Sequence, residues 1–264
     1  MRFGVCTGAG NASIVAATGW DYIELGVAGE LIPEADGAAW AERKSALLAL
    51  PLPCETFNLF VPKHLKITGP DVNQAALTHY VRTALTRAAE VGGKVIVFGS
   101  GGARQLPESG WSAAQAHAQL LWFLNQCADA HETTGVIVAI EPLNRAECNV
   151  LHTVAEGAAL AREVGRAGVK NLADTYHMEH NGEPLTEILA SADCLAHVHT
   201  ADTERKAPGM GNFAHSALFR TLKDAGYDAR VSIECSFTEG RFEAELGQAL
   251  AHLKAAYRSA QSAG

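Results

Sequence analysis

The 264-residue sequence lacks any C-x-x-C pair, although it contains six cysteines. Cysteines that occur singly, several of them inside apolar runs, are typical of reduced core residues in a cytoplasmic protein. The sequence also lacks a signal-peptide-like apolar region after Met1, and it has no apolar run long enough to cross a membrane. We therefore expect a cytoplasmic protein without a membrane partner.

Positive charge is in deficit, because 21 lysines and arginines face 29 acidic residues and the net charge is −8. A protein that binds the phosphate backbone of nucleic acid needs a basic surface, so the composition argues against nucleic acid as the main partner. Hydrophobic residues make up 48% of the chain, which excludes a disordered protein. We expect a folded protein that acts on a small molecule.

Apolar, strand-like runs alternate with helix-like stretches along the whole chain, and no composition break or linker interrupts them. We therefore expect one domain over residues 1–264, with the last few residues frayed. The expected strands are 3–7, 22–27, 54–60, 94–98, 136–141, 170–175, 195–201 and 230–235. The expected helices are 11–18 with Asn11 as N-cap, 38–50, 71–91, 112–132 with Ser112 as N-cap, 153–165, 184–190, 215–225 and 242–257.

Eight alternating strand–helix units predict an α/β protein with a parallel sheet. The simplest closed arrangement is a single (β/α)8 TIM barrel, and an open doubly wound sheet is the alternative. No G-x-G-x-x-G follows the first strand, which disfavours the open sheet. Candidate functional side chains also end four separate strands, and side chains converge in this way at the C-terminal mouth of a barrel.

Four strand ends carry groups that bind metals: Glu141, Asp174, His199 and Glu234. Taken singly, each has an ordinary explanation, such as a solvated acid, a turn-capping aspartate or a buried structural histidine. Together, three carboxylates and one imidazole form a hard site that suits Mn²⁺, Mg²⁺ or Co²⁺ better than structural zinc. Three buried acids would repel one another without a cation, so the pattern predicts one divalent metal.

Three further features lie near these residues without a settled role. His197 points to the same side of its strand as His199, which favours a structural or supporting role. The segment 99–104, with sequence GSGGAR, is either a flexible loop or a site whose amides and Arg104 bind an anionic substituent. Residues 56–63 would form a partly apolar wall, and Glu24 is an acid within an apolar frame.

Four motifs resemble one family: EPLNRAE at 141–147, DTYHM at 174–178, HTADTERKAPG at 199–209, and Glu234 near the end of the last strand. The chain resembles the xylose isomerase-like TIM-barrel superfamily, and within it the ketose 3-epimerases of the D-tagatose 3-epimerase type. The resemblance covers the chain as a fold and is specific mainly over residues 136–235. The segment 99–104 departs from the epimerase pattern, which leaves the substrate open.

The resemblance implies a role for each matching residue. Glu141, Asp174, His199 and Glu234 would bind one divalent metal, with Mn²⁺ preferred and Mg²⁺, Co²⁺ or Zn²⁺ as alternatives. Glu141 and Glu234 would also act as the acid/base pair. The further residues that would hold substrate oxygens are Glu147, His177 and Arg205. The implied enzyme is a metal-dependent sugar epimerase that works through an enediolate and forms a homo-dimer or tetramer.

Several other functions share the scaffold. A hydroxypyruvate-type isomerase, a keto-inositol dehydratase and a lyase for oxidised sugars would all begin with the same enolisation. An apurinic-endonuclease-like nuclease would need more histidine ligands and a basic track, and the sequence shows neither. A non-catalytic metabolite-binding protein is disfavoured because both proposed acid/base positions hold glutamates. Fold alone does not separate these alternatives.

Overall fold

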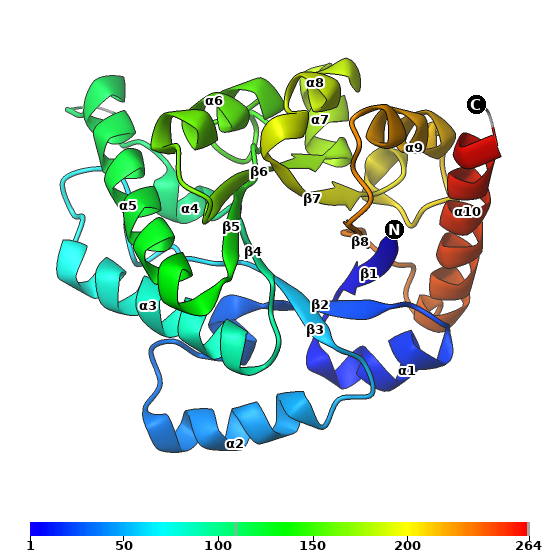
Figure 1. Ribbon diagram of the computed structural model, residues 1–264, viewed down its shortest axis with the longest axis horizontal. Coiled ribbons are helices and arrows are strands. Elements are labelled where there is room, and N and C mark those ends of the chain that lie inside the picture. Colours follow the sequence, from blue (N-terminus) through cyan, green and yellow to red (C-terminus); the bar gives the residue numbers. More distant parts are fainter. Residues whose placement is uncertain (109, 263–264) are drawn as a thin grey trace.

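Eight parallel strands close into a barrel in the computed structural model (Figure 1), which describes residues 1–108 and 110–262. The strands are β1 (Arg2–Cys6), β2 (Tyr22–Gly26), β3 (Cys54–Asn58), β4 (Val95–Phe98), β5 (Ile137–Ile140), β6 (Val169–Asp174), β7 (Leu195–Thr200) and β8 (Arg230–Ile233). Because β1 pairs with both β2 and β8, the sheet has no open edge. The predicted TIM barrel is confirmed, and the open doubly wound sheet is wrong.

Helices surround the barrel on its outside (Figure 1). They are α1 (Ala12–Ala17), α2 (Gly37–Leu48), α3 (Gln74–Glu90), α4 (Gly101–Arg104), α5 (Ala113–Thr134), α6 (Val154–Val164), α7 (Thr175–Asn181), α8 (Thr186–Ala190), α9 (His215–Asp224) and α10 (Phe242–Ser262). Within the described residues, none of these helices is both long enough and apolar enough to span a bilayer.

Helix boundaries follow local capping chemistry. Ser112 caps α5 as predicted, in a capping box that it forms with Gln115. Asn11 occupies the N-cap position of α1 as predicted, but its side chain makes no cap bond, and its amide donates instead to Thr7 Oγ1 at 2.8 Å. The last helix extends to Ser262 rather than ending at residue 257, so residues 259–262 are helical and not frayed. Residues 263–264 lie outside the described part of the chain.

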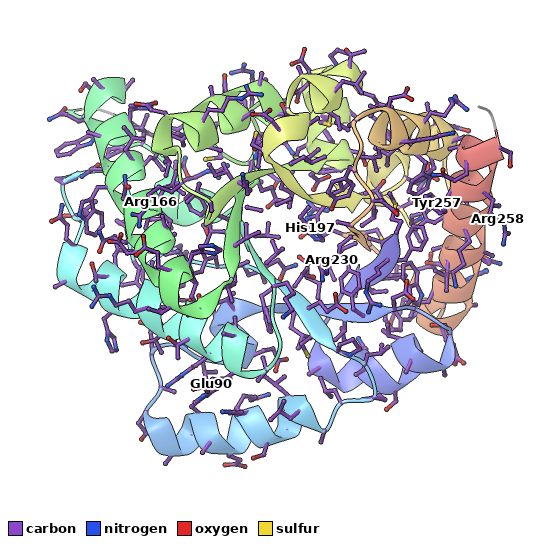
Figure 2. The ribbon with its side chains drawn as sticks, in the orientation of Figure 1. Glu90, Arg166, His197, Arg230, Tyr257 and Arg258 are labelled. Carbon is purple, nitrogen blue, oxygen red and sulfur yellow. The ribbon has the colours of Figure 1, made fainter. Side chains whose placement is uncertain are left out.

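The barrel interior is apolar on one side and polar on the other. Val95, Val97, Ala139 and Leu172 form a small apolar cluster from β4, β5 and β6. Fully buried polar side chains lie on β2, β3, β7 and β8: Glu24, Thr56, His197, His199 and Ser232. His197 lies near the barrel axis, whereas Tyr257 lies on α10 at the periphery (Figure 2). Buried polar groups need hydrogen-bond partners, so this side of the interior is held by specific contacts.

Candidate metal centre and active site

The four predicted metal ligands meet at the C-terminal mouth of the barrel. Asp174 ends β6 and His199 lies within β7, while Glu141 and Glu234 directly follow β5 and β8. Each of the four offers one ligand atom, and these atoms all lie within 4.8 Å of one another. Parallel strands end at the same rim of a barrel, which is why residues spread over 94 positions of the sequence become neighbours here.

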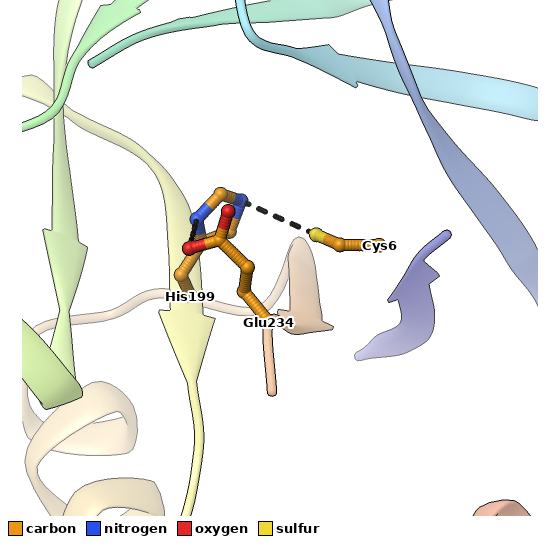
Figure 3. Close-up of side chains that lie close together, drawn as sticks. All are labelled: Cys6, His199 and Glu234. Carbon is orange, nitrogen blue, oxygen red and sulfur yellow. Dashed lines mark hydrogen bonds and ion pairs between the residues drawn. The ribbon is translucent and has the colours of Figure 1, made fainter. Parts of the chain in front are cut away.

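Both ring nitrogens of His199 lie close to carboxylate groups. Its Nδ1 lies 3.0 Å from Glu141 Oε1 and 3.7 Å from Glu234 Oε2. On the opposite side of the ring, Nε2 lies 2.8 Å from Glu24 Oε1 and 3.9 Å from Cys6 Sγ. Figure 3 shows the Glu234 carboxylate and the Cys6 sulfur approaching different nitrogens of this ring. One ring nitrogen therefore faces the acids at the mouth, and the other faces the barrel interior.

The two glutamates at the mouth differ in how readily they ionise. Burial opposes ionisation of Glu141, but the hydrogen bond with His199 and the nearby positive charges, that of His199 first, together outweigh it and lower the Glu141 pKa below its ordinary value. For Glu234, burial raises the pKa to about 7, with repulsion from Glu141 and Asp174 adding to it and the charges of His199 and Arg205 opposing it. Two carboxyl groups with pKa values moved apart are a common arrangement for acid/base chemistry.

The donor set fits a divalent cation. Asp174 is 2% exposed and its Oδ1 accepts a hydrogen bond from Tyr176 N at 2.8 Å, but its Oδ2 has no hydrogen-bond partner. A buried carboxylate oxygen without a partner costs roughly 1–3 kcal/mol or more, so it points to a ligand. Three carboxylates and one imidazole nitrogen are donors that Mn²⁺, Mg²⁺ or Co²⁺ accept.

His177 presents a donor to the same site. Its Nδ1 accepts the main-chain N–H of Asn144 at 3.2 Å and lies 3.0 Å from the Asn144 side-chain nitrogen. A main-chain N–H only donates, so Nδ1 of a neutral His177 is unprotonated and Nε2 carries the hydrogen. That Nε2 lies 3.7 Å from Asp174 Oδ2. Asn144 thus orients His177 with an N–H toward the metal ligands.

Arg205 lies between Glu234 and Glu147. Its Nη2 lies 2.6 Å from Glu234 Oε2, and its Nη1 lies 3.6 Å from Glu147 Oε1. The guanidinium also lies over the Tyr176 ring, 4.6 Å from the centroid. Arg205 itself has φ +57°, in the left-handed region that non-glycine residues rarely adopt. This backbone conformation, together with three contacts, holds the guanidinium at the mouth of the barrel.

A cavity of about 350 Å³ opens beside these groups. One wall consists of the polar residues Glu141, Glu147, His177, Arg205 and Glu234. The other wall is largely apolar and includes Leu59, Val61, Pro62 and Leu143, which come mainly from the segment expected to form it. A volume of this size fits a small metabolite. The structure therefore brings all five predicted catalytic and substrate-contacting residues onto one cavity, with Asp174 and His199 beside them.

The segment 99–104 has a different role from either expectation. Residues 101–104 form the short helix α4 rather than a flexible loop, and Gly99 to Gly102 line the cavity. A side chain at Gly99 would lie 2.3 Å from Glu141 Oε2, so only glycine leaves room for that carboxylate. Arg104 is fully buried and donates to the carbonyl oxygens of Phe98 and Glu141 at 3.0 and 2.8 Å. It is not available to a substrate anion and instead anchors the ends of β4 and β5.

Three contacts around the site were not predicted from the sequence. Cys6, expected to be an ordinary core residue, ends β1 beside His199 Nε2. Asn144, which lies within the 141–147 motif, turns out to orient His177. Glu24 was visible in the sequence as an acid among apolar residues, but nothing local indicated its partner. All three depend on neighbours that lie far away along the chain.

A family model for the xylose isomerase-like TIM barrel matches residues 12–256. The chain belongs to this family. Among curated relatives, D-psicose 3-epimerase of Agrobacterium fabrum is 35% identical over 112 residues. That alignment covers 42% of this chain and 39% of the relative, so the chain spans about two fifths of the length of the relative that it matches.

Solved structures extend the similarity to nearly the whole chain. The crystal structure of 3-keto-D-glucoside 4-epimerase (YcjR) from E. coli is 25% identical, with a TM-score of 0.82, and the match covers 97% of this chain and 99% of that one. D-psicose 3-epimerase from Clostridium cellulolyticum H10, solved with D-tagatose, has a TM-score of 0.85 at 19% identity over 97% and 99% of the two chains. At that identity the second similarity shows the fold alone.

Proposed function

We propose that this family member is a divalent-metal-dependent epimerase or isomerase of a sugar or sugar derivative, with ketose 3-epimerisation as the favoured reaction. The chemistry is proton removal from, and proton return to, a carbon next to a carbonyl. Glu141 and Glu234 are the proposed acid/base pair. The observation that carries the proposal is the convergence of these two glutamates, whose pKa values are moved in opposite directions, on one cavity with His199.

The two glutamates come from strands that are not adjacent in the barrel, with β6 and β7 between them. A substrate carbon between the two carboxylates would have one of them on each face. One carboxylate takes the C–H proton, the electron pair moves onto the carbonyl oxygen, and an enediolate forms. Return of a proton from the other carboxylate to the opposite face inverts the centre. Return of the proton to the neighbouring carbon gives an aldose–ketose isomerisation instead.

Three further residues would hold the substrate. The Nε2–H of His177 donates to an oxygen on which negative charge develops, and Arg205 adds a positive charge beside Glu234. Glu147, which accepts from Asn144 Nδ2 at 2.9 Å, would accept a hydrogen bond from a sugar hydroxyl. The apolar wall opposite would contact the carbon face of the substrate.

We propose Glu141, Asp174, His199 and Glu234 as the ligands of one divalent ion, with Mn²⁺ preferred because the set is mostly oxygen. When bound, such an ion supplies Lewis-acid stabilisation of the substrate oxygens. The unpartnered Asp174 Oδ2 supports this assignment. Mg²⁺, Co²⁺ and Zn²⁺ are the alternatives.

Solvent exchange in D₂O tests the proposal. Metal-free protein is reconstituted with Mn²⁺ and incubated with a panel of ketoses, 3-keto-glycosides and hydroxypyruvate, and proton NMR follows deuterium at each carbon. We expect deuterium next to the carbonyl of one substrate class, together with an epimer of it, and no exchange in EDTA. Metal-independent exchange, or no exchange with any substrate, would refute the proposal.

The site of the label separates the reactions that share this scaffold. Deuterium and inversion at C3 identify a 3-epimerase, as named for the Agrobacterium relative. Inversion at C4 of a 3-keto-glycoside identifies the reaction named for the E. coli structure, which is favoured as second candidate by a match over 97% of the chain. Loss of water or cleavage of the substrate would instead identify a dehydratase or a lyase. The homo-dimer or tetramer remains a prediction, which light scattering checks.

A further inference from the structure

Beneath the proposed metal ligands lies a second set of polar side chains, which we call the Glu24 network: Tyr22, Glu24, Thr56, His197, His199 and Ser232. All six are fully buried. They belong to β2, β3, β7 and β8, and only His199 also belongs to the proposed metal site. Nothing in the acid/base chemistry described above requires the other five.

Glu24 accepts every hydrogen bond that its carboxylate oxygens make in this network. Its Oε1 lies 2.8 Å from His199 Nε2. Its Oε2 lies 2.9 Å from His197 Nε2, and it accepts from the hydroxyls of Thr56 at 2.7 Å and Ser232 at 2.6 Å. An ionised carboxylate only accepts, so all four partners donate to it. Ser232 therefore uses its one proton on Glu24, and Tyr22, whose oxygen lies 2.8 Å from Ser232 Oγ, donates to Ser232.

The strand register explains how Tyr22 reaches across β1. Gly4 of β1 pairs with Tyr22 of β2 on one side and with Ser232 of β8 on the other. A side-chain carbon at Gly4 would lie 2.1 Å from the Tyr22 ring, so the ring occupies the space that a side chain would take. The tyrosine hydroxyl thereby reaches β8. The network is built by the packing of three neighbouring strands and is not a chance approach of side chains.

The Glu24 network decides which ring nitrogen of His199 carries a hydrogen. Carboxylate oxygens lie beside both ring nitrogens, Glu24 at Nε2 and Glu141 at Nδ1. A metal bound at Nδ1 would replace the hydrogen there, and Glu24 would keep the remaining hydrogen on Nε2, so that the Nδ1 lone pair is directed at the metal. A carboxylate behind a metal-binding histidine fixes the ring orientation and the tautomer in this way. We propose that Glu24 is a positioning residue that holds His199 in the metal-binding tautomer, an inference that rests on the proposed metal centre.

A second cation held by Glu24, His197 and His199 is the competing explanation, because ligand atoms of these three residues also lie within 4.8 Å of one another. The contacts disfavour it. Both imidazole nitrogens already lie at hydrogen-bond distance from the carboxylate, and two hydroxyls donate to it as well. A cation there would have to displace these hydrogens and would give His199 two metals, one on each nitrogen. Two tightly bound cations per chain would therefore overturn the proposal.

The first test reads the tautomer directly. Long-range ¹H–¹⁵N spectra of ¹⁵N-labelled protein, loaded with Mg²⁺ and assigned with His199→Asn, report which ring nitrogen of His199 carries hydrogen. We expect a slowly exchanging Nε2–H in the wild-type protein, with and without Mg²⁺, and its loss or fast exchange in Glu24→Gln. An unprotonated Nε2 in wild type, or an unchanged Nε2–H in Glu24→Gln, would overturn the proposal. A residue needed only for folding would not change the tautomer.

The second test measures Mn²⁺ binding by the EPR signal of free Mn²⁺. We expect one Mn²⁺ per wild-type chain and a 10–100-fold weaker dissociation constant for Glu24→Gln. The matched control is Glu55→Gln on the neighbouring strand β3, because the Glu55 carboxylate pairs with Arg2 and Arg230 and not with a residue of the network. We expect its affinity to stay within twofold of wild type. Equal affinity of Glu24→Gln and wild type would overturn the proposal.

Two further results could complicate these tests: a Glu24→Gln variant that does not fold, and a wild-type protein that binds no divalent cation. Should Glu24→Gln fail to fold, Thr56→Val removes one donor to Glu24 at nearly constant volume and should weaken Mn²⁺ binding by a few-fold, whereas no change would count against the proposal. Should wild type bind no divalent cation, the proposed function fails. The Nε2–H measurement without Mg²⁺ then still decides whether Glu24 sets the His199 tautomer.

Discussion

The ends of β5 and β8 look alike in sequence, since an isoleucine followed directly by a glutamate closes each strand, but the barrel places the two acids in different surroundings. Glu141 is 6% exposed, its carbonyl oxygen is anchored by Arg104, and its carboxylate lies against His199. Glu234 is partly exposed and is bonded to Arg205 at the cavity mouth. Burial and neighbouring charges lower the pKa of Glu141 and raise that of Glu234, so two similar sequence patterns yield carboxyl groups that differ in how readily they ionise.

The largest effect is expected from Glu234→Gln, which keeps the shape of the side chain but removes its proton transfer. We expect turnover of the substrate identified by deuterium exchange to fall by about 10³-fold or more. Product formation followed by NMR measures this. Glu239→Gln, at an exposed position of the same segment, should retain wild-type turnover. Activity of Glu234→Gln above one tenth of wild type would remove Glu234 from the acid/base pair.

Arg104→Met tests the anchor of the β5 end. The substitution leaves the buried carbonyls of Phe98 and Glu141 without their donor, which should cost roughly 3 kcal/mol of the free energy of unfolding. Urea unfolding followed by circular dichroism measures the loss. Arg82→Met, at an exposed site on α3, should change stability by less than about 0.5 kcal/mol. If both variants are equally stable, Arg104 does not anchor this strand end.

Arg205→Met removes the charge beside Glu234 but not the carboxyl group. We expect kcat/KM to fall about 10–100-fold because a charged partner at the reacting oxygens is lost. The Glu234 pKa should rise further, since the guanidinium opposes the effect of burial. The acid limb of the kcat/KM profile should therefore move to higher pH. Arg205→Lys should restore part of the rate, and a profile that does not move would separate Arg205 from Glu234.

The smallest expected effect is on the melting temperature of the metal-free protein, which should depend on pH. The Glu234 pKa of about 7 lies above the value of an unfolded glutamate, near 4.3, so the protonated form stabilises the fold. This contribution is complete below pH 4 and is lost as pH rises through 7. We expect metal-free wild type to melt roughly 5 °C below metal-free Glu234→Gln at pH 8, and the two to converge near pH 4. A Tm difference independent of pH would contradict the raised pKa.

The fold was predictable because strand and helix patterns are local. The predicted strand boundaries agree with the observed ones to within one or two residues. The strand expected at 54–60 ends at Asn58, because the next residue, Leu59, has a φ of +49° and leaves the extended conformation. Helix α7 was missed because it begins directly after Asp174, whose side chain caps it while belonging to the site. A residue that serves two purposes gives an ambiguous local signal.

The candidate site was predictable in part. Acids and a histidine at successive strand ends indicated which residues would converge, because strand ends share a rim whatever the packing beneath them. The direction in which Arg104 points was not predictable. An arginine next to glycines at a strand end suits an anion site as well as a buried anchor, and only the carbonyl groups that surround it distinguish the two.

The sequence by itself determined the number of strand–helix units and the strand ends that carry acids, since both follow from periodicity over a few residues. The tertiary structure decided the partner of Glu24, the tautomer that it favours in His199, and the opposite pKa shifts of Glu141 and Glu234. Each depends on groups brought together only when the barrel closes. Burial and the distance between charges exist only in the folded chain, so no local pattern encodes them.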